Sequence, residues 1–126
     1  EIMKVNVASQ RDDAIRMFIA QAEKDLANGY RVIVGGDFNE PSHRDWIEKN
    51  KNLYDHNGFV VPWTVTTLLE EAGFIDSYRK IYPNPLTHPG FTYPSDNLAK
   101  TPEKITWAPK RTNGIVLILS SIKEKD

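Results

Sequence analysis

Two polar side chains, Asp37 and Asn39, follow an apolar run that ends at Gly36. Residues two apart share a face of an extended chain, so the sequence predicts that the carboxylate and the amide converge on one point. A carboxylate can orient or deprotonate a water or bind a metal ion, and an amide can donate to a phosphoryl oxygen as charge develops. The pairing therefore suits phosphoryl chemistry. An ordinary turn, with Asp37 and Asn39 accepting hydrogen bonds from nearby backbone, is the alternative interpretation.

The segments before this pair are predicted to be a helix and a strand. Apolar residues recur at helical spacing over residues 11–28, and Gly29 follows where a left-handed cap belongs. Residues 31–36 form a β-branched run closed by two glycines, which predicts a buried strand. This strand would deliver Asp37 to its C-terminal end.

The segments after the pair are predicted to be two helices separated by a loop. Ser42 is in position to be an N-cap, with a short helix over residues 44–50. Residues 52–63 are rich in Asn, Gly, Asp and Pro and predict a loop. A second amphipathic helix is expected over residues 65–72, ended by Gly73.

Length and composition indicate one small domain over residues 1–126, with a proline-rich stretch at residues 82–102 that predicts an ordered loop. Sixteen Lys and Arg against 17 Asp and Glu give a net charge of −1, which does not favour binding to nucleic acid. The absence of cysteine excludes disulfides and thiol chemistry. No apolar stretch is long enough to span a membrane, and the localisation stays open.

The motif Gly36-Asp37-Phe38-Asn39 after an apolar strand resembles the central signature of the endonuclease/exonuclease/phosphatase family. The similarity to bacterial members extends over about residues 11–110. Three stretches carry it, residues 36–46, 73–79 and 89–97.

The resemblance implies an α/β fold, as part of a four-layer α/β/β/α sandwich, and a hydrolase of phosphate esters that is a metal-dependent phosphodiesterase or phosphatase. Asp37 would position or activate the attacking water and bind Mg²⁺ or Mn²⁺, and Asn39 would contact the scissile phosphate. His43, at the start of the predicted short helix, could reach a phosphate, although a first-turn histidine is also commonly solvated.

Other side chains are interpreted as structural. His56 and His88 are expected in turns or at the surface, and Asp76 is expected to pair with Arg79. Asp96 is interpreted as a turn acid. The three tryptophans are predicted to pack between layers: Trp46, Trp63 and Trp107.

The sequence departs from the family at both ends. No metal-binding Glu is recognisable upstream of Asp37, and the closing Asp-His pair is absent. From Arg111 the resemblance gives way to an atypical tail, residues 111–126. Codons can be chosen for this tail so that a one-base deletion near the Arg111 codon converts a family-like Arg-Ile-Asp-Phe-Ile strand into it, with the family's Asp where Ile118 stands. In the plain interpretation residues 115–119 are simply an apolar strand.

Two functional hypotheses follow for a domain truncated at both ends. The first is the metal-dependent phosphoesterase. The second is a catalytically inactive fragment that acts as a binding or interaction module. A partial sandwich would expose the face of its sheet, and we expect self-association through that face.

Overall fold

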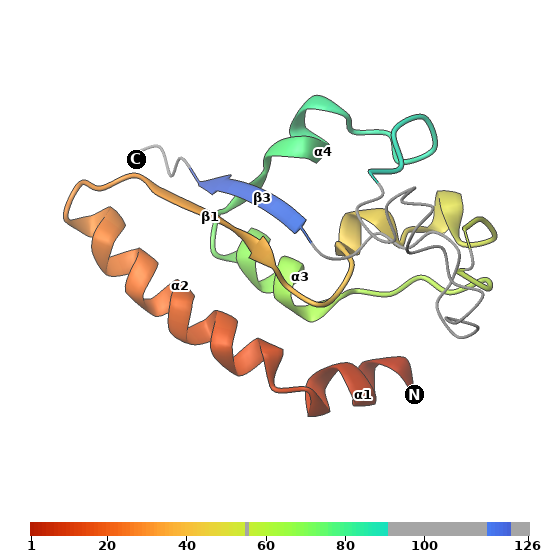
Figure 1. Ribbon diagram of the computed structural model, residues 1–126, viewed down its shortest axis with the longest axis horizontal. Helices are drawn as coiled ribbons and strands as arrows, with labels where there is room; N and C mark the ends of the chain where they lie inside the picture. Colours follow the sequence, from red (N-terminus) through yellow and green to blue (C-terminus); the bar gives the residue numbers. More distant parts are fainter. Residues whose placement is uncertain (55, 91–115, 122–126) are drawn as a thin grey trace, which may run out of the picture.

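The computed structural model describes residues 1–54, 56–90 and the backbone of 116–121 (Figure 1). The helices and strands follow in the order α1 (Ile2–Ala8), α2 (Arg11–Ala27), β1 (Val32–Asp37), the 3-10 helices η1 (His43–Asp45) and η2 (Glu48–Asn50), α3 (Thr64–Glu71), β2 (Ile75–Asp76), α4 (Ser77–Ile81) and β3 (Val116–Ser121).

The strands form a small antiparallel sheet in the order β1-β3-β2, in which β3 pairs with both of the others. Asp37 lies opposite Val116, where β3 begins. Ile33 and Ile75 both lie opposite Ser120, from the two sides of β3. The two isoleucines therefore stand in one row across the sheet and point to the same face.

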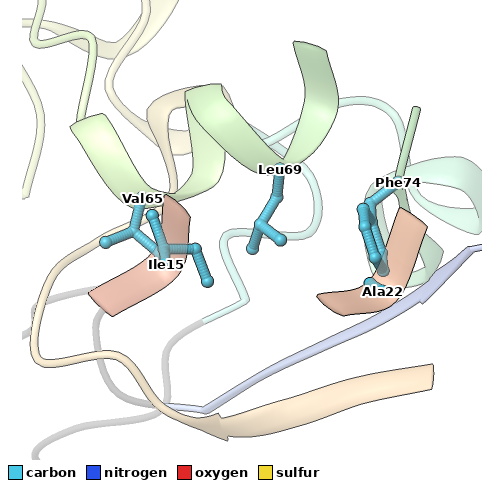
Figure 2. Packing of buried hydrophobic residues seen from close by; sticks show 5 residues of the cluster. All are labelled: Ile15, Ala22, Val65, Leu69 and Phe74. Atoms are coloured by element: carbon cyan, nitrogen blue, oxygen red, sulfur yellow. The ribbon is translucent and has the colours of Figure 1, made fainter. Parts of the chain in front are cut away.

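The hydrophobic core lies between α2 and α3 (Figure 2). Its members are almost completely buried: Ile15, Ala22, Val65, Leu69 and Phe74. Val32 and Val34 of β1 pack against this cluster from the sheet side. Figure 1 shows α2 running alongside β1, so the core is held between two helices and one face of the sheet.

The expectation of a four-layer α/β/β/α sandwich is wrong. The described chain is mostly helical: α2 alone has 17 residues, whereas the strands have six, two and six. β1 is also not a buried strand. Val32 and Val34 face the core while the Ile33 side chain is 72% exposed, so helices cover only one face of the strand.

The two amphipathic helices are confirmed. α2 ends at Ala27, and α3 ends at Glu71. Each is followed by a glycine in the left-handed conformation, with φ of 88° at Gly29 and 93° at Gly73. A side chain would be strained at either position, which is why glycine ends both helices.

The predicted short helix over residues 44–50 is wrong in form. Two separate 3-10 turns, η1 and η2, occupy this stretch. The Ser42 cap is confirmed, since its hydroxyl accepts a hydrogen bond from the Arg44 backbone N–H at 3.2 Å. The carboxylate of Asp45, the last residue of η1, pairs with Arg79 of α4.

The atypical tail contributes the strand β3, in line with the plain interpretation of residues 115–119 as an apolar strand. Ile118, the position assigned to the family's Asp by the frameshift hypothesis, lies opposite Gly35 of β1. Asp96 and Trp107 lie outside the described residues. Among the described residues, no helix is both long and apolar enough to cross a bilayer.

Candidate functional site

The predicted site residues Asp37 and Asn39 are both exposed: Asp37 is the last residue of β1, and Asn39 lies in the turn that follows it. The backbone N–H of Asn39 donates to Asp37 Oδ1 at 2.9 Å, and Asn39 has a φ of 52°. Phe38 between them packs against the core. The chain is therefore not extended through Asn39, and the argument from strand alternation does not hold there. The two residues are brought together by the turn itself.

The segment that follows, residues 40–45, is fastened to the rest of the molecule at three points, and we call it the anchoring segment. Its first anchor is the Glu40 carboxylate, which is 5% exposed. It accepts from Asn6 Nδ2 of α1 at 2.6 Å and from the Val65 backbone N–H of α3 at 2.5 Å. Burial raises the pKa of Glu40, and these two hydrogen bonds oppose that shift.

The second anchor is the His43 ring, which lies against α3. His43 Nδ1 is 2.8 Å from Thr66 Oγ1, and Nε2 is 2.8 Å from a carboxylate oxygen of Glu70. The same threonine oxygen accepts from the His43 backbone N–H at 2.9 Å. Glu70 also accepts two hydrogen bonds from Arg44, at 2.7 and 2.6 Å. Both ring nitrogens are thus engaged within the protein, and a role for His43 in substrate binding stays a prediction.

The electrostatics of this anchor favour a neutral imidazole. Burial lowers the pKa of His43, while the Glu70 carboxylate opposes that shift. The hydrogen bond from Arg44 holds the pKa of Glu70 below its usual value. With its proton on Nε2, the neutral ring donates a hydrogen bond to Glu70 and accepts one at Nδ1 from the Thr66 hydroxyl.

The third anchor is a buried ion pair between Asp45 and Arg79. The Arg79 Nε donates to Asp45 Oδ1 at 2.6 Å, and the side chain of Arg79 is almost fully buried. The guanidinium also donates to three backbone carbonyls, those of Tyr82, His88 and Pro89. The expected pairing of Arg79 with the Asp76 carboxylate is replaced by a cap, since Asp76 Oδ1 accepts from the Arg79 backbone N–H at 2.9 Å.

The two histidines outside the motif, His56 and His88, stack on aromatic side chains. His56 is 1% exposed and stacks on Trp46 with ring centroids 4.0 Å apart, so it is a core residue rather than a surface one. Trp46 in turn meets Trp63 edge to face at 5.4 Å, so these two tryptophans pack on each other and not between the layers of a sandwich. His88 is exposed and stacks on Tyr82 at 4.4 Å.

The predicted metal ion would need more ligands than Asp37. Among the described residues, no three His, Cys, Asp or Glu side chains form a group that could hold a metal ion. Mg²⁺ usually keeps several of its waters and is bound by one or two carboxylates together with substrate phosphates, so an all-protein ligand set is not required. Asp37 is exposed and could supply one oxygen.

Part of the chain is similar to a known protein. An uncharacterized protein of Caenorhabditis elegans is 44% identical over 66 residues, which is 52% of this chain and 20% of that protein. The chain thus spans about a fifth of the length of this relative. No protein-family profile matches the chain, and no solved structure matches it.

Sequence reasoning missed the residues that hold the turn in place. Asn6 lies in α1, a helix that no sequence signal predicted. Asn6 and Glu40 are also 34 positions apart in the sequence. Glu40 follows Asn39 directly, yet a glutamate before a proline suggests only a solvated loop. The available signal was the apolar surroundings of the motif, which make any neighbouring carboxylate a candidate for burial.

Proposed function

We propose that this chain is part of a metal-dependent hydrolase of phosphate esters, a phosphodiesterase or phosphatase, and that the turn Asp37-Phe38-Asn39 is its reactive element. The observation that carries the proposal is the geometry of this turn at the end of β1: Asp37 and Asn39 are both exposed, and the Asp37 carboxylate accepts a 2.9 Å hydrogen bond from the backbone N–H of Asn39. The resemblance of the motif to the endonuclease/exonuclease/phosphatase signature gives the reaction class.

The chemistry proposed for the two side chains is complementary. The Asp37 carboxylate orients a water and accepts its proton as the water attacks phosphorus. The Asn39 amide donates a hydrogen bond to a phosphoryl oxygen, on which negative charge increases in the transition state. A divalent ion, when bound, would neutralise charge on the phosphate group. Asp37 is the residue proposed to contact such an ion.

Hydrolysis of bis-p-nitrophenyl phosphate in the presence of Mg²⁺ or Mn²⁺ tests the proposal. We expect turnover that requires the metal and that falls by about 100-fold or more in Asp37→Asn, the loss typical of a missing general base. Asp13→Asn, which removes an exposed carboxylate from α2, is the matched control and should retain the rate of the unaltered chain. Equal turnover in the unaltered chain and in Asp37→Asn, or no turnover in either, would contradict the proposal.

A second proposal, that the chain is an interaction module without catalysis, is favoured by the uncovered face of the sheet. Ile33 is 72% exposed and Ile75 is 39% exposed, and both lie opposite Ser120 in the same row. Exposed apolar side chains that lie together on a sheet favour association with another apolar surface. A second copy of this chain would supply one.

Light scattering coupled to size-exclusion chromatography tests this second proposal. Ile33→Asp should shift the chain from dimer to monomer, with a change of less than about 0.5 kcal/mol in the free energy of unfolding of the monomer, because the side chain is exposed. Met17→Asp, on an exposed position of α2, is the control and should leave the dimer intact. A monomer at all concentrations before any substitution would contradict self-association.

A further inference from the structure

The turn that carries Asp37 and Asn39 depends on a buried carboxylate outside it. Asn39 has a φ of 52°, a left-handed conformation that L-residues adopt rarely and that persists where the surrounding structure fixes it. The hydrogen bond from its N–H to Asp37 Oδ1 lies within the turn, and before Asn39 the chain is held by the pairing of β1 and by Phe38, which packs against the core. The next residue, Glu40, is where the chain becomes buried again.

Glu40 joins three segments that are distant in the sequence. One of its carboxylate oxygens accepts from Asn6 Nδ2 of α1, and the other accepts from the Val65 N–H in the first turn of α3. The Asn6 side chain completes the junction, since its oxygen accepts a hydrogen bond from the Thr64 hydroxyl. Asn6 is 4% exposed; the two hydrogen bonds to Glu40 are buried, and the one from Thr64 is partly buried.

The first turn of α3 favours the buried position of the Glu40 carboxylate. Trp63, the residue that precedes this helix, provides no side-chain cap. The Glu40 carboxylate takes over that role from another segment of the chain, and it does so at the helix end where a negative charge is favourable. Its attachment at two points fixes the residue adjoining Asn39 in both position and direction.

From this geometry we infer that Glu40 and Asn6 are positioning residues, which hold Asn39 in its left-handed conformation and so keep its backbone N–H on the Asp37 carboxylate. The inference rests on the proposed function only for the effect on hydrolysis. Its structural part, that the conformation of the turn depends on the junction with α1 and α3, stands separately.

The test compares Glu40→Gln with Glu71→Gln, which makes the same chemical change at an exposed position of α3. The NMR readout is the intraresidue cross-relaxation between the amide and α protons of Asn39, which is strong when φ is positive. We expect it to weaken in Glu40→Gln and to stay strong in Glu71→Gln. In hydrolysis of bis-p-nitrophenyl phosphate, kcat should fall between about 10- and 100-fold in Glu40→Gln with KM unchanged, because misplaced groups lose rate rather than substrate affinity.

Each outcome decides one claim. A strong Asn39 signal in folded Glu40→Gln would overturn the inference, whatever the rate. If the unaltered chain does not hydrolyse the ester, the proposed function fails and the Asn39 signal still decides the inference. If circular dichroism shows that Glu40→Gln is unfolded, Asn6→Ala takes its place: it removes one of the two donors to Glu40, and an unchanged Asn39 signal there would equally overturn the inference.

Discussion

The apolar core and the anchoring segment, residues 40–45, stabilise the same fold by different means. The core joins α2 and α3 through side chains such as Ile15 and Leu69, which contact each other without directional bonds. The anchoring segment is attached by buried polar groups, above all Glu40 and Asp45, each of which requires a specific partner. Apolar contacts tolerate a substitution of similar volume, whereas a buried charge without its partner is costly.

The apolar core therefore stabilises the fold, whereas the anchoring segment holds the candidate site in place. The core brings β1 against the helices and so determines where the strand ends. The anchoring segment determines how the chain continues beyond Asn39. We therefore expect substitutions in the two regions to have different signatures, and the predictions below are ordered by expected size.

The largest effect is expected from the buried ion pair. Arg79→Met leaves the Asp45 carboxylate buried without its cation and removes the donors to three backbone carbonyls, so the free energy of unfolding should fall by about 3 to 5 kcal/mol. Urea denaturation followed by circular dichroism measures this. Lys80→Met, at the exposed neighbouring position, should change stability by less than about 0.5 kcal/mol. A loss no greater than that of the control would show that the ion pair does not hold the segment.

The core substitution comes next. Leu69 is 0% exposed, and Leu69→Ala opens a cavity between α2 and α3 that should cost about 2 to 5 kcal/mol. Leu69→Met, which keeps the volume, should cost less than about 1.5 kcal/mol. The same pair of urea titrations measures both. Equal destabilisation of the two variants would show that the core does not tolerate a substitution of similar volume. The contrast between the core and the anchoring segment would then be lost.

A smaller, pH-dependent effect is expected at His43. Its pKa in the folded chain is lowered by burial, so the unfolded chain takes up a proton at a higher pH than the folded one does. The stabilisation from the neutral ring is complete above the ordinary histidine pKa and is lost as the pH falls through the lowered value. The free energy of unfolding should therefore decrease on acidification from about pH 7 to about pH 5.

His43→Gln should make that decrease shallower, because glutamine does not titrate. His88→Gln is the matched control, since His88 is exposed, and it should leave the slope unchanged. A slope in His43→Gln equal to that of the unaltered chain would assign the pH dependence to other groups.

Regular elements were predictable from local patterns, and long-range polar contacts were not. The periodicity of residues 11–28 predicted α2, and Gly73 predicted the end of α3, because both signals lie within the elements themselves. The four-layer sandwich failed because it was inferred from a resemblance carried by short motifs, and such motifs do not specify which faces of the sheet are covered. Ile33 and Val34 have similar β propensity and lie on opposite faces.

The candidate site was predictable in composition but not in geometry. The types and spacing of Asp37 and Asn39 identified the turn, whereas the hydrogen bonds that hold the next residue, Glu40, come from α1 and α3, which no local pattern encodes. The Thr64 hydroxyl donates a hydrogen bond to Asn6, and these two residues are 58 positions apart in the sequence. Such a pair becomes visible only when α1 and α3 are placed beside each other.

The most direct test of the central claim, that the turn after β1 is the reactive element, is a titration with Mn²⁺ alone followed by NMR. The ion broadens signals of nearby nuclei, so the amide signals of Asp37, Phe38 and Asn39 should broaden first in the unaltered chain and in Asp13→Asn. They should remain sharp in Asp37→Asn. Broadening shared equally among exposed carboxylates, or unchanged by Asp37→Asn, would contradict the assignment of the site to this turn.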